Sequence, residues 1–64
     1  MTNKQIELCK KAFFVELGED FLRVDGFDPE EQVMYVHDEN SGEEYSLDKG
    51  ELAECKFFEL REIN

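Results

Sequence analysis

The sequence predicts one α+β domain in which a short N-terminal helix precedes four or five short antiparallel strands. Three observations lead to this fold class. Apolar residues recur at helical spacing from residue 3 onward, whereas those after Gly18 mostly alternate with polar residues, as in strands. The glycines and the single proline lie between these stretches, where turns are expected. With 64 residues, 41% of them hydrophobic, the chain is expected to form a single domain, residues 1–64, with a thin core.

The N-terminal helix is expected to begin at residue 3. Thr2 and Gln5 match the capping box, in which each side chain accepts a hydrogen bond from the other residue's backbone N–H. The apolar side chains that follow at helical spacing are Ile6, Cys9 and Phe13. This spacing gives the helix one apolar face, which is expected to pack on the rest of the domain.

The end of this helix has two readings. The helix could run to Leu17, with Gly18 supplying the left-handed residue that often caps a helix. Alternatively it stops near Lys11, and residues 13–17 form a strand. We favour the strand, because valine and aromatic residues cluster in this stretch.

A hairpin is expected between the strands at residues 33–38 and 43–47, joined by the turn sequence Asn-Ser-Gly. A four-residue loop pairs Val36 with Tyr45, and a two-residue loop would slide the pairing by two places without changing the faces. We take one face as the core, with Met34, Val36, Tyr45 and Leu47. The opposite face carries Val33, Tyr35 and His37.

The other strands are shorter or less regular. Leu22 and Val24 alternate with polar residues, and Gly26 marks a bulge or a bend after them. A proline-containing turn separates this strand from the hairpin. A single helical turn at residues 51–54 precedes a last strand at residues 56–63. In this last strand, Phe58 and Leu60 lie on one side, and Phe57 and Ile63 on the other.

This order of elements resembles that of the small SH3-like and Sm-like barrels. No motif of either family stands at matching positions, so no family membership is assigned. The resemblance implies a curved antiparallel sheet, either closed into a small barrel or left as a curled sheet. Such barrels host many unrelated functions, so the outline predicts no activity.

The charge of the chain restricts its partners. The 17 acidic residues outnumber the seven lysines and arginines and give a formal charge of −10. This negative field repels nucleic acid and anionic membranes, so direct binding to either is not expected, whereas basic proteins are attracted. No stretch is apolar enough to span a membrane, and no export signal follows Met1. We therefore expect a cytoplasmic protein in which Cys9 and Cys55 are free thiols.

Enzymatic chemistry and a metal or cofactor site are not expected. His37 is the only histidine, and no local pattern pairs it with a nucleophile. Cys9, His37 and Cys55 lack the close spacing of structural zinc ligands. The stretch from residue 38 has Glu43 and Lys49 where a calcium loop requires Gly and Glu. The glycines are isolated, so no phosphate-binding loop is present.

The sequence therefore favours a non-enzymatic protein-interaction module, an accessory or regulatory protein of the kind that phages and mobile elements carry. Its partner is expected to be a basic protein. The expected partner-binding residues are Val33, Tyr35, His37 and Phe57. The N-terminal helix, a second copy in a homodimer, or the partner is expected to cover this apolar face. The alternative is a nucleic-acid mimic that inhibits a DNA- or RNA-binding protein, although the acidic residues look scattered along the chain.

Overall fold

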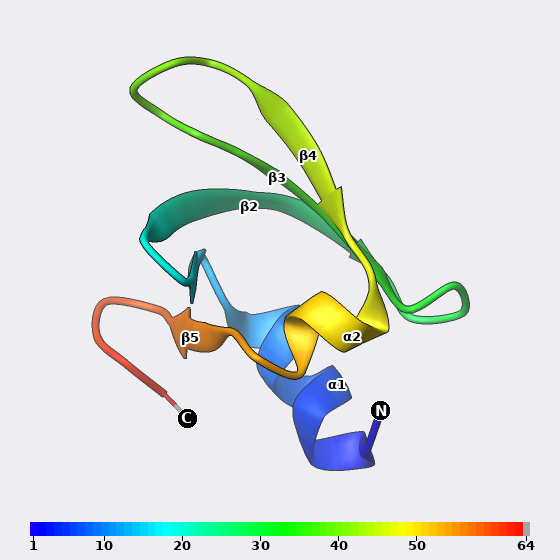
Figure 1. The fold of residues 1–64 in the computed structure, drawn as a ribbon. Helices are drawn as coiled ribbons and strands as arrows, with labels where there is room; N and C mark the ends of the chain where they lie inside the picture. Colours follow the sequence, from blue (N-terminus) through cyan, green and yellow to red (C-terminus); the bar gives the residue numbers. More distant parts are fainter. Residues whose placement is uncertain (64) are drawn as a thin grey trace.

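The chain folds into a five-stranded antiparallel sheet with two short helices packed on one of its faces (Figure 1). The computed structural model describes residues 1–63, and Asn64, the last residue of the predicted domain 1–64, lies outside them. The elements are α1 (Asn3–Lys11), β1 (Phe14–Leu17), β2 (Asp20–Asp28), β3 (Val33–His37), β4 (Glu44–Leu47), α2 (Lys49–Leu52) and β5 (Lys56–Phe58). This arrangement confirms the predicted α+β class.

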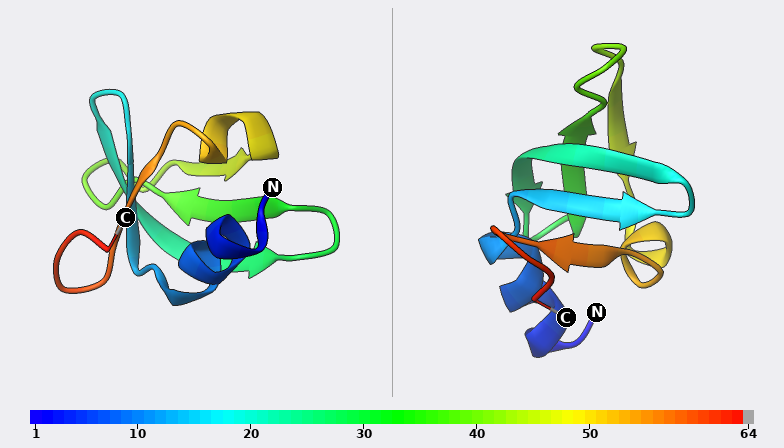
Figure 2. Two further views of the ribbon diagram at one scale, coloured as in Figure 1. Left: turned by 90° about the horizontal axis from the view of Figure 1, so that it is seen from below. Right: turned by 90° about the vertical axis from the view of Figure 1, so that its left-hand side faces the viewer.

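The sheet has the strand order β4-β3-β2-β1-β5. Its two edge strands, β4 and β5, are not paired with each other, so the sheet curls without closing into a barrel (Figure 2). The curled sheet, rather than the closed barrel, is therefore the alternative that fits.

The helix α1 begins as the sequence predicts. The backbone N–H of Gln5 donates to Oγ1 of Thr2 over 3.2 Å, and the N–H of Thr2 donates to Oε1 of Gln5 over 3.0 Å. Both bonds satisfy N–H groups that have no partner within the helix. The predicted capping box is confirmed.

The helix ends at Lys11 because the chain enters the sheet directly afterwards. The N–H of Phe13 donates to the carbonyl of Phe58 over 2.7 Å, and the carbonyl of Phe13 accepts from the N–H of Val24 over 2.9 Å. These bonds commit Phe13 to the sheet, so its backbone cannot continue the helix. The strand reading of residues 13–17 is confirmed, and the longer helix is wrong.

β2 contains a bulge. Val24 pairs with Val36 and Gly26 pairs with Tyr35, so Asp25 is an extra residue on its strand. Such a bulge bends the strand and increases its twist. The bulge or bend predicted at Gly26 is confirmed, and the nine-residue β2 pairs with β1 through its first part and with β3 through its second part.

The hairpin of β3 and β4 has the register predicted for a four-residue loop. Val36 pairs with Tyr45, and Met34 pairs with Leu47. Met34, Val36 and Leu47 are buried, but Tyr45 is 44% exposed. The core assignment of Tyr45 is therefore wrong, because this end of the hairpin extends away from both helices (Figure 1).

The core lies between the sheet and the two helices. Its buried residues are Cys9, Ala12, Val15, Leu22, Met34, Val36, Leu47, Leu52, Cys55 and Phe57. Since α1 contributes Cys9 and α2 contributes Leu52 to this layer, both helices pack on the core face. The helix α1 therefore does not cover the face that carries Tyr35. The expectation that this helix covers it is wrong.

The position of β5 differs from the prediction. It pairs with β1, at the edge of the sheet opposite β4, and two strands separate it from β3. Phe57 pairs with Val15 on the core face and is 2% exposed. The expected neighbourhood of Phe57 and Tyr35 is therefore wrong, because β5 does not lie beside β3.

The chain after β5 folds back along that strand. Phe58 forms an antiparallel bridge with Glu62, and the N–H of Ile63 donates to the carbonyl of Phe57 over 2.9 Å. The strand predicted at residues 56–63 is therefore wrong in length. Its second half instead covers the free edge of β5.

Candidate functional site

The outer face is the side of the sheet turned away from both helices. Alternation along the strands places on it Phe14 and Glu16 of β1, Phe21 and Arg23 of β2, Val33, Tyr35 and His37 of β3, Glu44 and Ser46 of β4, and Lys56 and Phe58 of β5. No helix packs on this face within the described part of the chain, since both helices contribute to the core on the other side. The outer face is therefore the surface on which a binding site can form.

The structure brings together three of the four predicted site residues. Val33, Tyr35 and His37 lie on the outer face of β3 as expected from the alternation. Tyr35 is 51% exposed, and Val33 and His37 are half-buried. Phe57 does not join them, because it is part of the core at the other edge of the sheet.

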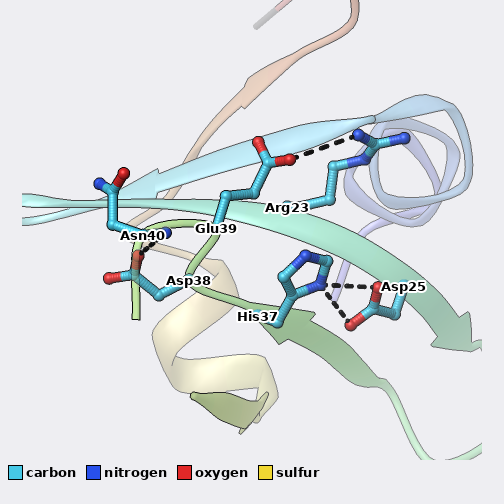
Figure 3. Close-up of polar contacts among 6 residues, drawn as sticks. All are labelled: Arg23, Asp25, His37, Asp38, Glu39 and Asn40. Carbon is cyan, nitrogen blue, oxygen red and sulfur yellow. Dashed lines mark hydrogen bonds and ion pairs between the residues drawn. The ribbon is translucent and has the colours of Figure 1, made fainter. Parts of the chain in front are cut away.

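Asp25 lies beside His37 because of the bulge in β2. The imidazole Nδ1 of His37 is 2.9 Å from both carboxylate oxygens of Asp25 (Figure 3). The ring is thereby held by a carboxylate on the neighbouring strand. The sequence predicted a bulge or a bend at Gly26, but it did not show that Asp25 would lie beside His37.

Arg23 stands near the middle of the outer face. Its Nη1 lies 3.7 Å from Oε2 of Glu39 (Figure 3), and its guanidinium carbon lies 5.3 Å from the centroid of the Phe14 ring. Both Arg23 and Glu39 are about half exposed, so the ion pair contributes little to stability. Its position separates an aromatic half of the outer face from a polar half.

The aromatic half contains a cluster of three rings that the sequence analysis missed. The rings of Phe14 and Phe21 stack with centroids 5.1 Å apart, and Phe21 meets Phe58 edge-on at 5.3 Å. Phe21 remains half exposed. The signal was present, because Phe21 and Arg23 occupy alternate positions of one strand and must share a face.

The polar half belongs to a segment with a strongly asymmetric charge. Residues 24–48 contain nine acidic residues and neither lysine nor arginine, which gives this segment a formal charge of −9. The other 39 residues contain eight acidic and seven basic residues, a charge of −1. Nearly the whole net charge therefore belongs to one contiguous segment that includes the hairpin of β3 and β4, because every lysine and arginine lies outside it, whereas acidic residues occur along the whole chain.

A shallow hollow opens among residues of the segment 24–48. It is lined by Asp25, Tyr35, Val36, His37, Gly42, Glu44 and Tyr45. Glu44 pairs with His37 across the two strands, and its carboxylate makes no ion pair or side-chain hydrogen bond within residues 1–63. The hydroxyl of Tyr45 donates to Oε2 of Glu43 over 2.9 Å, and this bond raises the pKa of Tyr45. The hollow therefore combines an exposed tyrosine with a carboxylate available to a ligand.

Cys9 and Cys55 are both buried, and neither takes part in a disulfide in this structure. Burial raises the pKa of Cys9 and of Cys55 to about 11, and the charges of Cys9, Glu51 and Glu54 add to the effect on Cys55. The thiol of Cys55 also donates to the carbonyl of Glu51 over 3.3 Å. Both groups are protonated at neutral pH, so they are poor nucleophiles and poor metal ligands.

In residues 1–63, no three His, Cys, Asp or Glu side chains are grouped so that they could hold a metal ion. Neither described helix has the length and apolar character needed to cross a bilayer. Comparison of the chain with protein-family models, curated proteins and solved structures found no match.

Proposed function

We propose that this chain is a non-catalytic protein-interaction module. It binds a basic protein through the polar half of its outer face, centred on Tyr35. One observation carries the proposal. A tyrosine ring that is 51% exposed stands within a segment that carries nine carboxylates and no lysine or arginine. Tyrosine is among the side chains that most often anchor protein interfaces.

The chemistry of this surface favours a cationic side chain as the group that binds. The face of a tyrosine ring attracts an ammonium or guanidinium group. Asp25 and Glu44 lie along the same hollow as Tyr35 and supply the opposite charge. The field of the whole acidic segment would also speed the encounter with a basic protein, because complementary charge steers association.

A nucleic-acid mimic is the second candidate, and the charge asymmetry favours it. The nine carboxylates of residues 24–48, which have no lysine or arginine among them, could occupy a groove that normally holds phosphates. Such binding would be dominated by charge and would weaken steeply between 50 and 200 mM salt, because salt screens the attraction between exposed charges. A module anchored on Tyr35 would retain much of its affinity over this range.

Capture from a cell extract tests the proposal. The wild-type chain, Tyr35→Ser and Leu60→Ser are immobilised separately, and the captured proteins are identified by mass spectrometry. Leu60 is the matched control because it is 97% exposed and lies beyond β5, away from the polar half of the outer face. We expect a basic protein that wild type and Leu60→Ser retain and Tyr35→Ser loses. Equal capture by Tyr35→Ser with a steep loss in salt would favour the mimic instead.

A further inference from the structure

The outer edge of β4 is open. β4 is the last strand of the sheet, and β3 is its single strand neighbour among residues 1–63. The N–H of Asp38 donates to the carbonyl of Glu43 over 2.9 Å, so Tyr45 and Leu47 also direct their backbone groups toward β3. The N–H and carbonyl groups of Glu44 and Ser46 therefore face away from the sheet, where another strand could pair with them.

The two edges of the sheet differ. The edge of β5 is covered by the fold-back of residues 59–63, through the bridge of Phe58 with Glu62 and the hydrogen bond from Ile63 to Phe57. No described segment covers β4 in this way, and its first three residues are exposed. An open edge is a template for pairing with a further strand.

The charge around this edge selects the strand that can pair. β4 lies in the segment 24–48, which has nine acidic residues and no lysine or arginine, and Glu43 and Glu44 stand at its beginning. Edge-to-edge pairing of two copies would bring two such segments together, and like charges oppose it. An extended segment with lysine or arginine at alternate positions would be attracted instead.

We propose that β4 accepts an extended basic segment of the partner as a sixth strand of the sheet. This inference rests on the proposed function and adds how the partner binds. Main-chain hydrogen bonds to Glu44 and Ser46 would supply affinity, and the alternate side chains would supply selectivity. A basic side chain opposite Glu44 lies on the outer face, beside the hollow with Tyr35, and the next residue lies on the side of Tyr45.

A defined peptide tests the inference. The probe is an end-blocked octapeptide of alternating lysine and valine, added to the ¹⁵N-labelled full chain. We expect the amide resonances of Glu44 and Ser46 to shift and their hydrogen exchange to slow at least tenfold, because both N–H groups gain a partner. The same peptide with glutamate in place of lysine is the charge control and should not bind.

Two variants separate strand addition from simple attraction between charges. In Ser46→Pro the outward N–H is lost, whereas the bonds of β4 to β3 are kept, since proline is tolerated on an edge strand when its N–H would face solvent. Ser46→Ala is the matched control. The second variant is a lysine-valine peptide N-methylated at every residue, which has no backbone N–H to donate to the carbonyls of Glu44 and Ser46 and leaves the protein unchanged. We expect at least tenfold weaker binding in both cases and unchanged binding with Ser46→Ala.

The outcomes distinguish this inference from the proposed function. Full binding of the peptide to Ser46→Pro, or full binding of the N-methylated peptide, would overturn strand addition. Absence of binding by the lysine-valine peptide would overturn it as well. In either case the capture experiment with Tyr35→Ser still decides the proposed function, because it depends on the outer face and not on the edge of β4.

Discussion

Replacement of Leu52 by alanine tests whether the short helix α2 is an integral part of the core. Leu52 has no exposed surface, and α2 is held by a capping box in which the N–H of Glu51 donates to Asp48 over 2.9 Å and the N–H of Asp48 donates to Glu51 over 3.2 Å. Truncation of a buried leucine to alanine costs about 2–5 kcal/mol, from lost burial and from the cavity that remains.

This loss is large for so small a domain. A chain of this length has a free energy of unfolding of about 3–10 kcal/mol. A loss of about 3 kcal/mol would therefore lower the melting temperature by roughly 12–24 °C. Leu60→Ala is the matched control, because Leu60 is 97% exposed and the same substitution there should change the free energy of unfolding by less than about 0.5 kcal/mol.

The assay is urea unfolding followed by far-ultraviolet circular dichroism, with thermal unfolding as the second readout. Leu52→Ala should shift the urea midpoint strongly, and Leu60→Ala should leave it in place. Equal midpoints for the two variants would refute the packing of α2 on the sheet.

Two further predictions concern pH. The raised pKa values of Cys9 and Cys55, about 11 against an ordinary 9, mean that the unfolded chain loses these protons first; the stability they contribute is complete below pH 9 and is lost between pH 9 and 11. Urea midpoints should fall over this range more steeply for wild type than for the double variant Cys9→Ala, Cys55→Ala, and parallel curves would contradict the assignment. Between pH 7 and the isoelectric point near 4.3, protonation of carboxylates removes repulsion, so self-association should increase. Light scattering that stays constant across this range would show that charge does not keep the copies apart.

The sequence was sufficient where the determining interactions are local. The cap at Thr2, the bend at Gly26 and the pairing of Val36 with Tyr45 all follow from residues close together in the chain. Capping and turn chemistry act over a few residues, so they can be read from one sequence. For this reason Tyr35 and His37 were placed on the correct face of their strand.

The errors concern contacts between distant segments. The choice of β1 rather than β3 as the neighbour of β5 depends on how the whole sheet curls, and it moved Phe57 from the expected site into the core. The exposure of Tyr45 depends on how far the two helices extend over the sheet. Phe21 is different, because alternation with Arg23 would have placed it on the outer face had the strand been extended by one residue.

The position of β5 also constrains the order in which the fold can form. Phe14 pairs with Phe58, which lies 44 residues later in the chain, whereas the pairs of β1 with β2 and of β3 with β4 are local. During synthesis, α1 and the strands β1 to β4 can associate first, and one edge of β1 stays unpaired until residues 56–58 leave the ribosome. Because non-local pairing is slow and unpaired edges are prone to aggregate, the nascent chain passes through a stage with exposed edges on both sides of its sheet. Docking of β5 on β1, together with the fold-back of residues 59–63 along β5, reduces these edges to one, the outer edge of β4.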